Sequence, residues 1–241
     1  MKIKLTIIFL LIISLTCLGK SRYNVILNPD RITKSDIELK TDDYILFILD
    51  YSNSMNEFLS ERTKYEMLLE SMKYILSRLS RENKIGVRLY GQRWGLTPMD
   101  ACRASSLVVP IKTDSLGYIS SAISKYKPRG MTPITYSLKQ AVTKDFKGLE
   151  GDKHIILITD GGENCDESPC KYAMELIKYR KDIKIDVIAF NIDNQDDLDQ
   201  LECVAKVTSG RLYNADTKAQ LMKSLDRAFK AKKEVDAVIV K

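Results

Sequence analysis

Histidine and tryptophan are almost absent from this chain of 241 residues, which contains one of each. The single histidine, His154, stands at the start of an apolar run and is expected to pack there. No histidine accompanies the cysteines, and this argues against a zinc site of the Cys/His type. The chain also has no glycine-rich loop that could cradle a phosphate and no evident nucleophile–base pair. These absences favour a binding protein over an enzyme.

Positive charge is in excess, but it is not concentrated anywhere. Lysine and arginine number 38 against 32 acidic residues, which gives a formal net charge of +6. The basic residues are scattered among acidic ones, and no basic run is interleaved with aromatic side chains. This pattern indicates a solvated surface and argues against nucleic acid as a partner. The length and the 44% of hydrophobic residues suit one large α/β domain.

The N-terminal segment is typical of an export signal rather than of a folded domain. Two lysines precede an apolar stretch from Leu5 to Leu15, which is too short to favour a membrane span. Two alternatives remain open: a signal peptide of residues 1–19, or a lipoprotein signal of residues 1–16 in which Cys17 becomes the lipidated first residue. Either predicts export to the bacterial cell envelope, as a lipoprotein or as a periplasmic or secreted protein. A membrane attachment is expected only through the lipid.

The remaining chain divides into a polar lead-in over residues 20–42, a domain over residues 43–233 and a C-terminal tail over residues 234–241. Within the domain, apolar β-prone runs alternate with stretches that repeat apolar residues at helical spacing. This alternation predicts a mainly parallel sheet with right-handed crossovers. Residues 59–80 are predicted to form one amphipathic helix and residues 217–232 a closing helix. A proline near the end of the run Ser106–Ile111 favours an edge strand, expected to be antiparallel.

Polar side chains with oxygen ligands follow two of the buried runs. Tyr44–Leu49 and Ile155–Thr159 are both expected to be central strands, and a third hydroxyl lies between them, just before a proline that can open a helix. The candidate ligands are Asp50, Ser52, Ser54, Thr132 and Asp160. Open α/β sheets bind ligands at the carboxyl ends of their strands, and hard oxygens suit a small divalent cation such as Mg²⁺. Read separately, Asp and Ser after a strand often only cap the next helix.

The order Asp-x-Ser-x-Ser, then Thr-Pro, then Ile-Thr-Asp-Gly-Gly resembles the von Willebrand factor A (VWA) family and its metal-ion-dependent adhesion site (MIDAS). The resemblance spans roughly residues 43–233. It implies a Rossmann-like α/β fold with a mostly parallel central sheet, one antiparallel edge strand and helices on both faces. It also implies that the three hydroxyls hold Mg²⁺, with the two carboxylates acting directly or through water. Mn²⁺ and Ca²⁺ are alternatives.

By this resemblance, the expected function is protein binding. The ion keeps exchangeable water, which an exposed Asp or Glu of a protein partner can replace, so we expect an adhesion or envelope-assembly module. The alternatives are a structural scaffold with a vestigial metal site and, less favoured, a Mg²⁺-dependent hydrolase. Loops over residues 55–58, 91–103 and 161–169 are expected to surround the ion. Trp94, Arg93 and Glu163 are therefore candidate partner contacts, although the tryptophan could instead fold back over the edge strand.

Four cysteines remain when Cys17 is set aside, and they allow three pairings. They are Cys102, Cys165, Cys170 and Cys203. Export would place them where disulfides persist. One arrangement is a local Cys165–Cys170 bridge; another joins Cys102 to Cys165 and Cys170 to Cys203. Either would stiffen the loop beside the metal.

Overall fold

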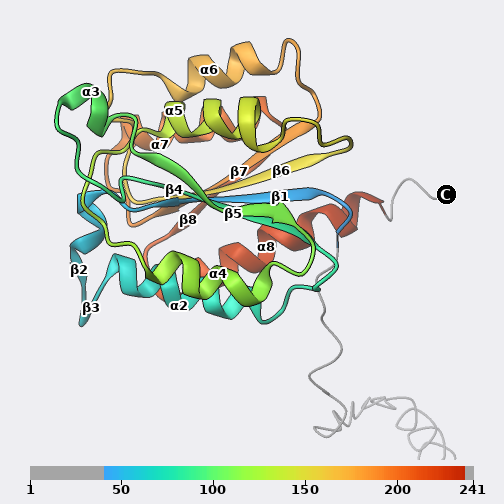
Figure 1. Cartoon of the computed structure of the whole chain (residues 1–241), viewed down its shortest axis with the longest axis horizontal. Helices are drawn as coiled ribbons and strands as arrows, with labels where there is room; N and C mark the ends of the chain where they lie inside the picture. The colour runs from blue at the N-terminus through green and yellow to red at the C-terminus, as the bar shows by residue number, and fades with distance from the viewer. Residues whose placement is uncertain (1–40, 237–241) are drawn as a thin grey trace, which may run out of the picture. The chain divides into compact units, whose positions relative to one another are not determined.

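The computed structural model describes residues 41–236 of the chain (Figure 1). The predicted signal segment, Cys17, nearly all of the lead-in over residues 20–42 and the end of the tail over residues 234–241 lie outside the described residues. What was predicted for those segments stays a prediction.

Six strands form one sheet in the order β5-β4-β1-β6-β7-β8. The strands are β1 (Tyr44–Asp50), β4 (Lys84–Tyr90), β5 (Ser105–Lys112), β6 (Lys153–Thr159), β7 (Ile183–Phe190) and β8 (Leu212–Ala215). Every neighbouring pair is parallel except β4 and β5, which are antiparallel. The mainly parallel sheet with one antiparallel edge strand is therefore confirmed.

Helices cover both faces of the sheet, as predicted (Figure 1). One face packs against α2 (Lys64–Leu76), α4 (Leu116–Ser124) and α8 (Lys218–Asp236). The other packs against α5 (Ile134–Gln140), α6 (Pro169–Leu176) and α7 (Gln195–Val207). Along β1, Phe47 and Leu49 belong to the first core, and Leu46 and Ile48 belong to the second. Because both faces are buried, the strand is apolar at every one of these positions rather than at alternate ones.

The predicted helix over residues 59–80 is too long at both ends, since α2 spans Lys64–Leu76, and its start is the larger error. Residues Phe58–Leu59 (β2) and Arg62–Thr63 (β3) form a small antiparallel hairpin, and α2 begins only at Lys64. The Thr63 hydroxyl accepts from the Glu66 N–H while the Glu66 carboxylate accepts from the Thr63 N–H. This capping box fixes the helix start. Leu59 matches the helical spacing, but it belongs to the hairpin.

Short helices complete the domain. A 3₁₀ turn (η2, Asn53–Asn56) follows β1, α3 (Pro98–Ala101) lies between β4 and β5, and a π-helical turn (η3, Ala141–Asp145) extends α5. The closing helix α8 continues to Asp236, beyond the predicted end at residue 232, so the first part of the predicted tail is helical. Over residues 41–236, none of the helices is long and apolar enough to cross a membrane.

Candidate metal centre

The predicted ligands lie on three segments that meet at the carboxyl end of the central strands. Asp50 ends β1, and Asp160 directly follows the neighbouring strand β6. Ser52 forms a parallel bridge with Gly130, which brings the segment that contains Thr132 alongside the segment after β1. Residues separated by more than a hundred positions are thus assembled at one edge of the sheet.

Three side-chain oxygens form a continuous chain at this edge. Ser52 Oγ lies 2.9 Å from Ser54 Oγ, and Ser54 Oγ donates to Asp160 Oδ1 at 2.7 Å. Neighbouring oxygens around an octahedral Mg²⁺, with bonds of about 2.1 Å, are roughly 3 Å apart. The spacing of these oxygens therefore fits the ligand set of a small, hard divalent cation.

Asp50 is completely buried next to this chain of oxygens. Its Oδ1 accepts from the Ser52 N–H at 2.6 Å and its Oδ2 accepts from the Thr159 hydroxyl at 2.9 Å. Burial, together with the nearby charge of Asp160, raises the pKa of Asp50 to about 7. A cation bound close to this carboxylate would favour its ionised form. The acidic pair is thus a place where added positive charge is stabilising.

One cation of the chain itself already contacts the centre. The Lys64 ammonium lies 3.1 Å from Asp160 Oδ2 and 2.9 Å from Glu57 Oε2. Its side chain is 7% exposed, so it is held at the site rather than in solvent. Sequence reasoning missed Lys64, because a lysine at a helix start ordinarily points to water and its partner is 96 positions away.

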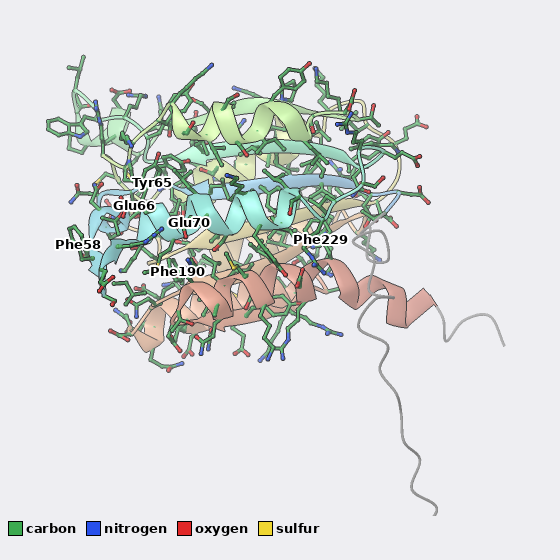
Figure 2. The ribbon with its side chains drawn as sticks, turned by 90° about the horizontal axis from the view of Figure 1, so that it is seen from below. Phe58, Tyr65, Glu66, Glu70, Phe190 and Phe229 are labelled. Atoms are coloured by element: carbon green, nitrogen blue, oxygen red, sulfur yellow. A yellow bond between two sulfur atoms is a disulfide. The ribbon has the colours of Figure 1, made fainter. Side chains whose placement is uncertain are left out.

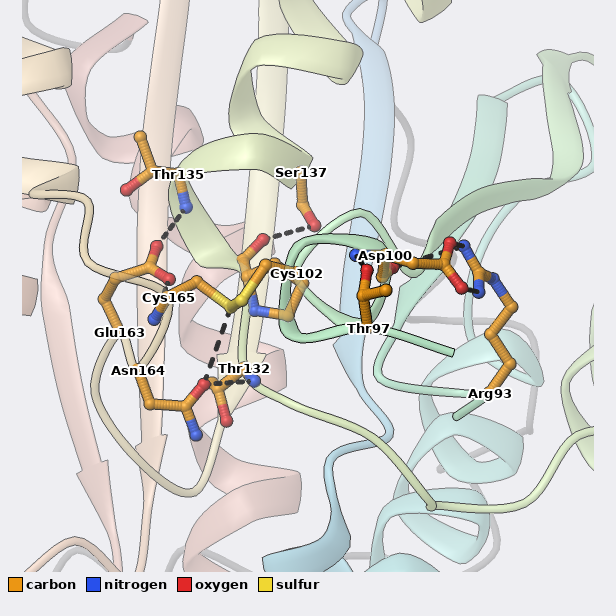
Figure 3. The surroundings of a disulfide bond; sticks show 11 residues. Arg93, Thr97, Asp100, Cys102, Thr132, Thr135, Ser137, Glu163, Asn164 and Cys165 are labelled. Atoms are coloured by element: carbon orange, nitrogen blue, oxygen red, sulfur yellow. Dashed lines mark hydrogen bonds and ion pairs between the residues drawn. A yellow bond between two sulfur atoms is a disulfide. The ribbon is translucent and has the colours of Figure 1, made fainter. Parts of the chain in front are cut away.

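The Thr132 segment is held by residues of the loop after β6 (Figure 3). Asn164 Oδ1 accepts from the Thr132 N–H at 2.6 Å. Glu163 accepts from the Thr135 N–H at 2.7 Å and from the Cys165 N–H at 3.1 Å, one with each carboxylate oxygen. Glu163 therefore braces the start of α5; its contact with a partner stays a prediction. No sequence signal other than proximity to Asp160 pointed to the bracing role of Asn164.

Two disulfides hold this loop and the helix that follows it. Cys102 is bridged to Cys165, and Cys170 is bridged to Cys203. The first ties the loop after β6 to the end of α3, and the second ties α6 to α7. This is the second of the two arrangements predicted, and the local Cys165–Cys170 bridge is not formed.

Gly91 lies between the Ser52 and Thr132 segments and is in close contact with both. It has a φ of +69°, and a Cβ there would lie 2.7 Å from both the Ser52 nitrogen and the Met131 oxygen. Its carbonyl oxygen accepts from the N–H groups of Arg129 and Gly130. Only glycine allows this backbone angle and this approach without strain, so Gly91 sets the spacing between the Ser52 and Thr132 segments.

The loop over residues 91–103 presents apolar side chains at the same end of the sheet. Trp94 is 74% exposed, and Leu96 and Met99 are also exposed. Trp94 therefore does not fold back over the edge strand. Arg93 forms a two-pronged ion pair with Asp100, with N–O distances of 2.9 and 2.7 Å. Arg93 thus stabilises the loop, and a partner contact by Arg93 or Trp94 stays a prediction.

Hydroxyl ligands distinguish this centre from one built on acids, histidines and cysteines. Within the described part of the chain, no group of three or more His, Cys, Asp or Glu side chains could hold a metal ion. A metal here would depend on serine and threonine oxygens, which suit Mg²⁺ better than softer cations.

A mostly parallel sheet with one antiparallel edge strand, and hydroxyl and carboxylate oxygens gathered at its carboxyl edge, define a VWA-type domain. The chain belongs to the von Willebrand factor type A domain family, whose family model matches residues 43–214.

The chain is also similar to several known proteins. YwmC, an uncharacterized protein of Bacillus subtilis (strain 168), is 26% identical over 194 residues, which cover 79% of this chain and 84% of YwmC. Among solved structures, proximal thread matrix protein 1 from the mussel byssus, with a zinc-occupied MIDAS motif, is similar with a TM-score of 0.62 and 22% identity. The match covers 81% of this chain but 47% of the mussel chain, about half its length.

A bacterial structure matches over nearly its whole length. An aerotolerance-related membrane protein from Bacteroides fragilis NCTC 9343, with multiple mutations to serines, is similar with a TM-score of 0.60 and 16% identity. The match covers 78% of this chain and 98% of that chain. At such identities, the likeness to solved structures shows the fold alone.

Proposed function

We propose that this protein is an exported binding module, without catalytic turnover, that uses Mg²⁺ at its MIDAS to engage an exposed carboxylate of a protein partner. The observation that carries the proposal is the chain of oxygens from Ser52 through Ser54 to Asp160, with successive distances of 2.9 and 2.7 Å.

The proposed ligand set would consist of neutral hydroxyl groups and charged carboxylates. The hydroxyls of Ser52, Ser54 and Thr132 would be the neutral ligands, which leave the positive charge of the site largely in place. Asp50 and Asp160 would balance part of it, directly or through water. When bound, Mg²⁺ supplies an electrophilic centre with exchangeable water positions. Asn164 would keep Thr132 at the site by holding its main chain.

Exposed apolar residues near the centre support a protein rather than a small molecule as the partner. Trp94, Leu96 and Met99 lie on the loop after β4, and Phe58 lies on the hairpin after η2. Figure 2 shows Phe58 at the end of the domain where α2 begins. Large side chains of this kind are common anchors at interfaces, so we propose that they flank a partner that offers its carboxylate to the metal.

Export is supported by the two disulfides, since such bonds persist in oxidising compartments and are rare in the cytosol. We propose a location in the bacterial cell envelope. The choice between a cleaved soluble form and a protein lipidated at Cys17 falls on residues outside the described part of the chain.

Thermal unfolding with and without metal tests the proposal. An ion that binds only the folded state stabilises it by about 2.7 kcal/mol at a hundredfold excess over its dissociation constant. We expect stabilisation by Mg²⁺ or Mn²⁺ over EDTA, with Ca²⁺ as a comparison. Ser54→Ala should abolish it, and Ser121→Ala, which removes an exposed hydroxyl on α4, should not. An unmodified protein that gains nothing from any of the ions would contradict the metal-dependent function.

The Lys64–Asp160 ion pair favours a second candidate, a structural VWA scaffold. A buried ammonium that neutralises Asp160 lets the centre persist without metal. On this candidate, affinity for a partner would not change when EDTA is added. The two functions are therefore separated by the metal dependence of binding, not by the fold.

A further inference from the structure

We propose that Lys64 is a built-in counter-cation of the metal centre. Its charge lowers the affinity of the site for a divalent ion and makes the metal-bound site more positive. The inference rests on the proposed metal site and adds to it the residue that sets its charge.

The position of Lys64 is fixed from several sides. It is the first residue of α2, and its N–H donates to the Glu57 carbonyl at 3.0 Å. Its ammonium pairs with Asp160 at 3.1 Å and with Glu57 at 2.9 Å. The β2–β3 hairpin turns the chain back so that α2 starts beside the centre. The lysine is therefore part of the site's framework and not a surface residue that happens to reach it.

The two oxygens of the Asp160 carboxylate have different partners. Oδ1 accepts from the Ser54 hydroxyl at 2.7 Å, and Oδ2 faces the Lys64 ammonium. One oxygen thus faces the hydroxyl ligands, while the other is occupied by a cation. The lysine fixes the orientation of Asp160 and cancels its charge from the side away from Ser54.

The formal charge of the centre follows from these contacts. Asp50 and Asp160 are the acidic groups of the site, and Lys64 cancels one of the two charges when both are ionised. A divalent ion then leaves the centre with a net positive charge, whereas without the lysine it would leave it neutral. Glu57 compensates little, because its side chain is 64% exposed and screened by water.

Two opposite consequences follow for binding. A fixed positive charge close to the ion repels it, so metal affinity is lower than the same ligands would give alone. The same charge strengthens the attraction of the loaded site for an anionic group of a partner. Lys64 would thus make partner binding and metal binding depend on each other, because an incoming carboxylate relieves the excess positive charge.

Titration of the purified protein with Mn²⁺ at constant pH, followed by calorimetry, tests the inference. Lys64→Met removes the charge and keeps an apolar stem of similar length. It should bind Mn²⁺ about tenfold more tightly than the unmodified protein, and Lys64→Arg, which keeps the charge, should stay within about twofold. Mn²⁺ affinity that is unchanged or weaker in Lys64→Met would overturn the proposal.

Tighter Mn²⁺ binding by Lys64→Met would also distinguish an electrostatic role of Lys64 from a merely structural one. A variant that only disturbs the hairpin or α2 would lose ligand geometry and bind Mn²⁺ less tightly, not more. If Lys64→Met does not fold, Lys64→Gln carries the same expectation, because it also removes the charge while keeping a polar end for Glu57. Failure of either folded variant to bind more tightly counts against the inference.

The outcomes also distinguish the inference from the proposed function. If Mn²⁺ binds Lys64→Met but not the unmodified protein, the counter-cation is supported and the proposed use of metal by the natural protein fails. If neither binds Mn²⁺, both fail. If both bind and Lys64→Met binds more tightly, both are supported.

Discussion

The side-chain oxygen of Asn164 lies 2.6 Å from the main-chain nitrogen of Thr132 and accepts its hydrogen bond. The next residue, Cys165, is covalently bound to Cys102 (Figure 3). The loop that begins at Asp160 therefore holds the Thr132 segment and is itself tied to α3. The segments that carry the proposed ligands are joined into one unit by contacts that lie outside the ligand set.

Removal of the Cys102–Cys165 bridge by a double substitution to alanine should loosen this unit. The bridge joins residues 63 positions apart, and its loss is expected to cost about 2–4 kcal/mol of unfolding free energy in urea. Amide exchange at Thr132, whose N–H is held by Asn164, should become faster. Cys170→Ala with Cys203→Ala is the matched control: it should also lower stability but leave exchange at Thr132 nearly unchanged. Equal exchange changes at Thr132 in both double variants would count against the special role of the first bridge.

Trp94 should behave as an exposed residue in two independent measurements. Because it is the only tryptophan and is 74% exposed, its fluorescence emission should barely shift when the protein unfolds. Trp94→Ala should change the unfolding free energy by no more than about 0.5 kcal/mol. It should weaken binding once a partner is found. A large red shift on unfolding would mean that this side chain is buried in solution.

Ionisation of Asp186 should make the free energy of unfolding depend on pH in the acidic range. Burial alone would raise its pKa, but hydrogen bonds from His154 and Lys184 outweigh burial and lower it. A lowered carboxyl pKa stabilises the fold above the unfolded value of about 4, and this contribution is lost as the pH falls towards the folded value. Asp186→Asn should therefore cost about 2 kcal/mol at pH 7.

In acid, the unfolding free energy of Asp186→Asn should approach that of the unmodified protein. Denaturant unfolding at several pH values is the measurement, and the difference from the unmodified protein should shrink below about pH 4. The main-chain N–H of Arg211 donates to Asp186 Oδ1 at 2.7 Å. The asparagine oxygen of the variant can keep that bond at all pH values. A difference that stays constant from pH 7 to pH 3 would mean that ionisation of Asp186 is not the cause.

Gly91→Ala should damage the metal centre through the backbone. A Cβ at Gly91 would meet the Ser52 nitrogen at 2.7 Å, in a backbone conformation that side chains disfavour. We expect a loss of about 1–3 kcal/mol in stability and a smaller stabilisation by Mg²⁺. Gly117→Ala is the control, since Gly117 lies in α4 with open space around its Cβ position. It should stabilise the protein by up to about 1 kcal/mol.

Much of the fold could be predicted because its signals are local. The apolar run Tyr44–Leu49, without alternation, indicated a strand buried on both faces, and β1 has that environment. Pro110 indicated the edge strand that β5 forms. The hairpin before α2 was missed because Leu59 matches helical spacing. The reciprocal Thr63 and Glu66 cap was the signal that could have placed the helix start.

The environment of the site was harder to predict than its ligands. Asp50 ends β1, and Ser52 and Asp160 come just after β1 and β6, so the parallel sheet brings these residues together as the pattern predicted. Metal binding by them stays a prediction. Lys64 and Asn164 act through contacts across 96 and 32 positions. Neither residue type nor spacing distinguishes such contacts from ordinary solvent exposure, because they depend on how the hairpin and the loop after β6 are folded.

The two disulfides also divide the covalent structure of the chain. The first ring closes at Cys165 and the second opens at Cys170, so the rings follow one another without overlap. A protease that cuts inside either ring leaves the chain in one piece until the bond is reduced. A cut between the rings, at residues 166–169, separates two halves that no bridge reconnects. Among these four cysteines each is bonded to a neighbour in chain order, so pairing in order of appearance among the four gives the two observed bonds.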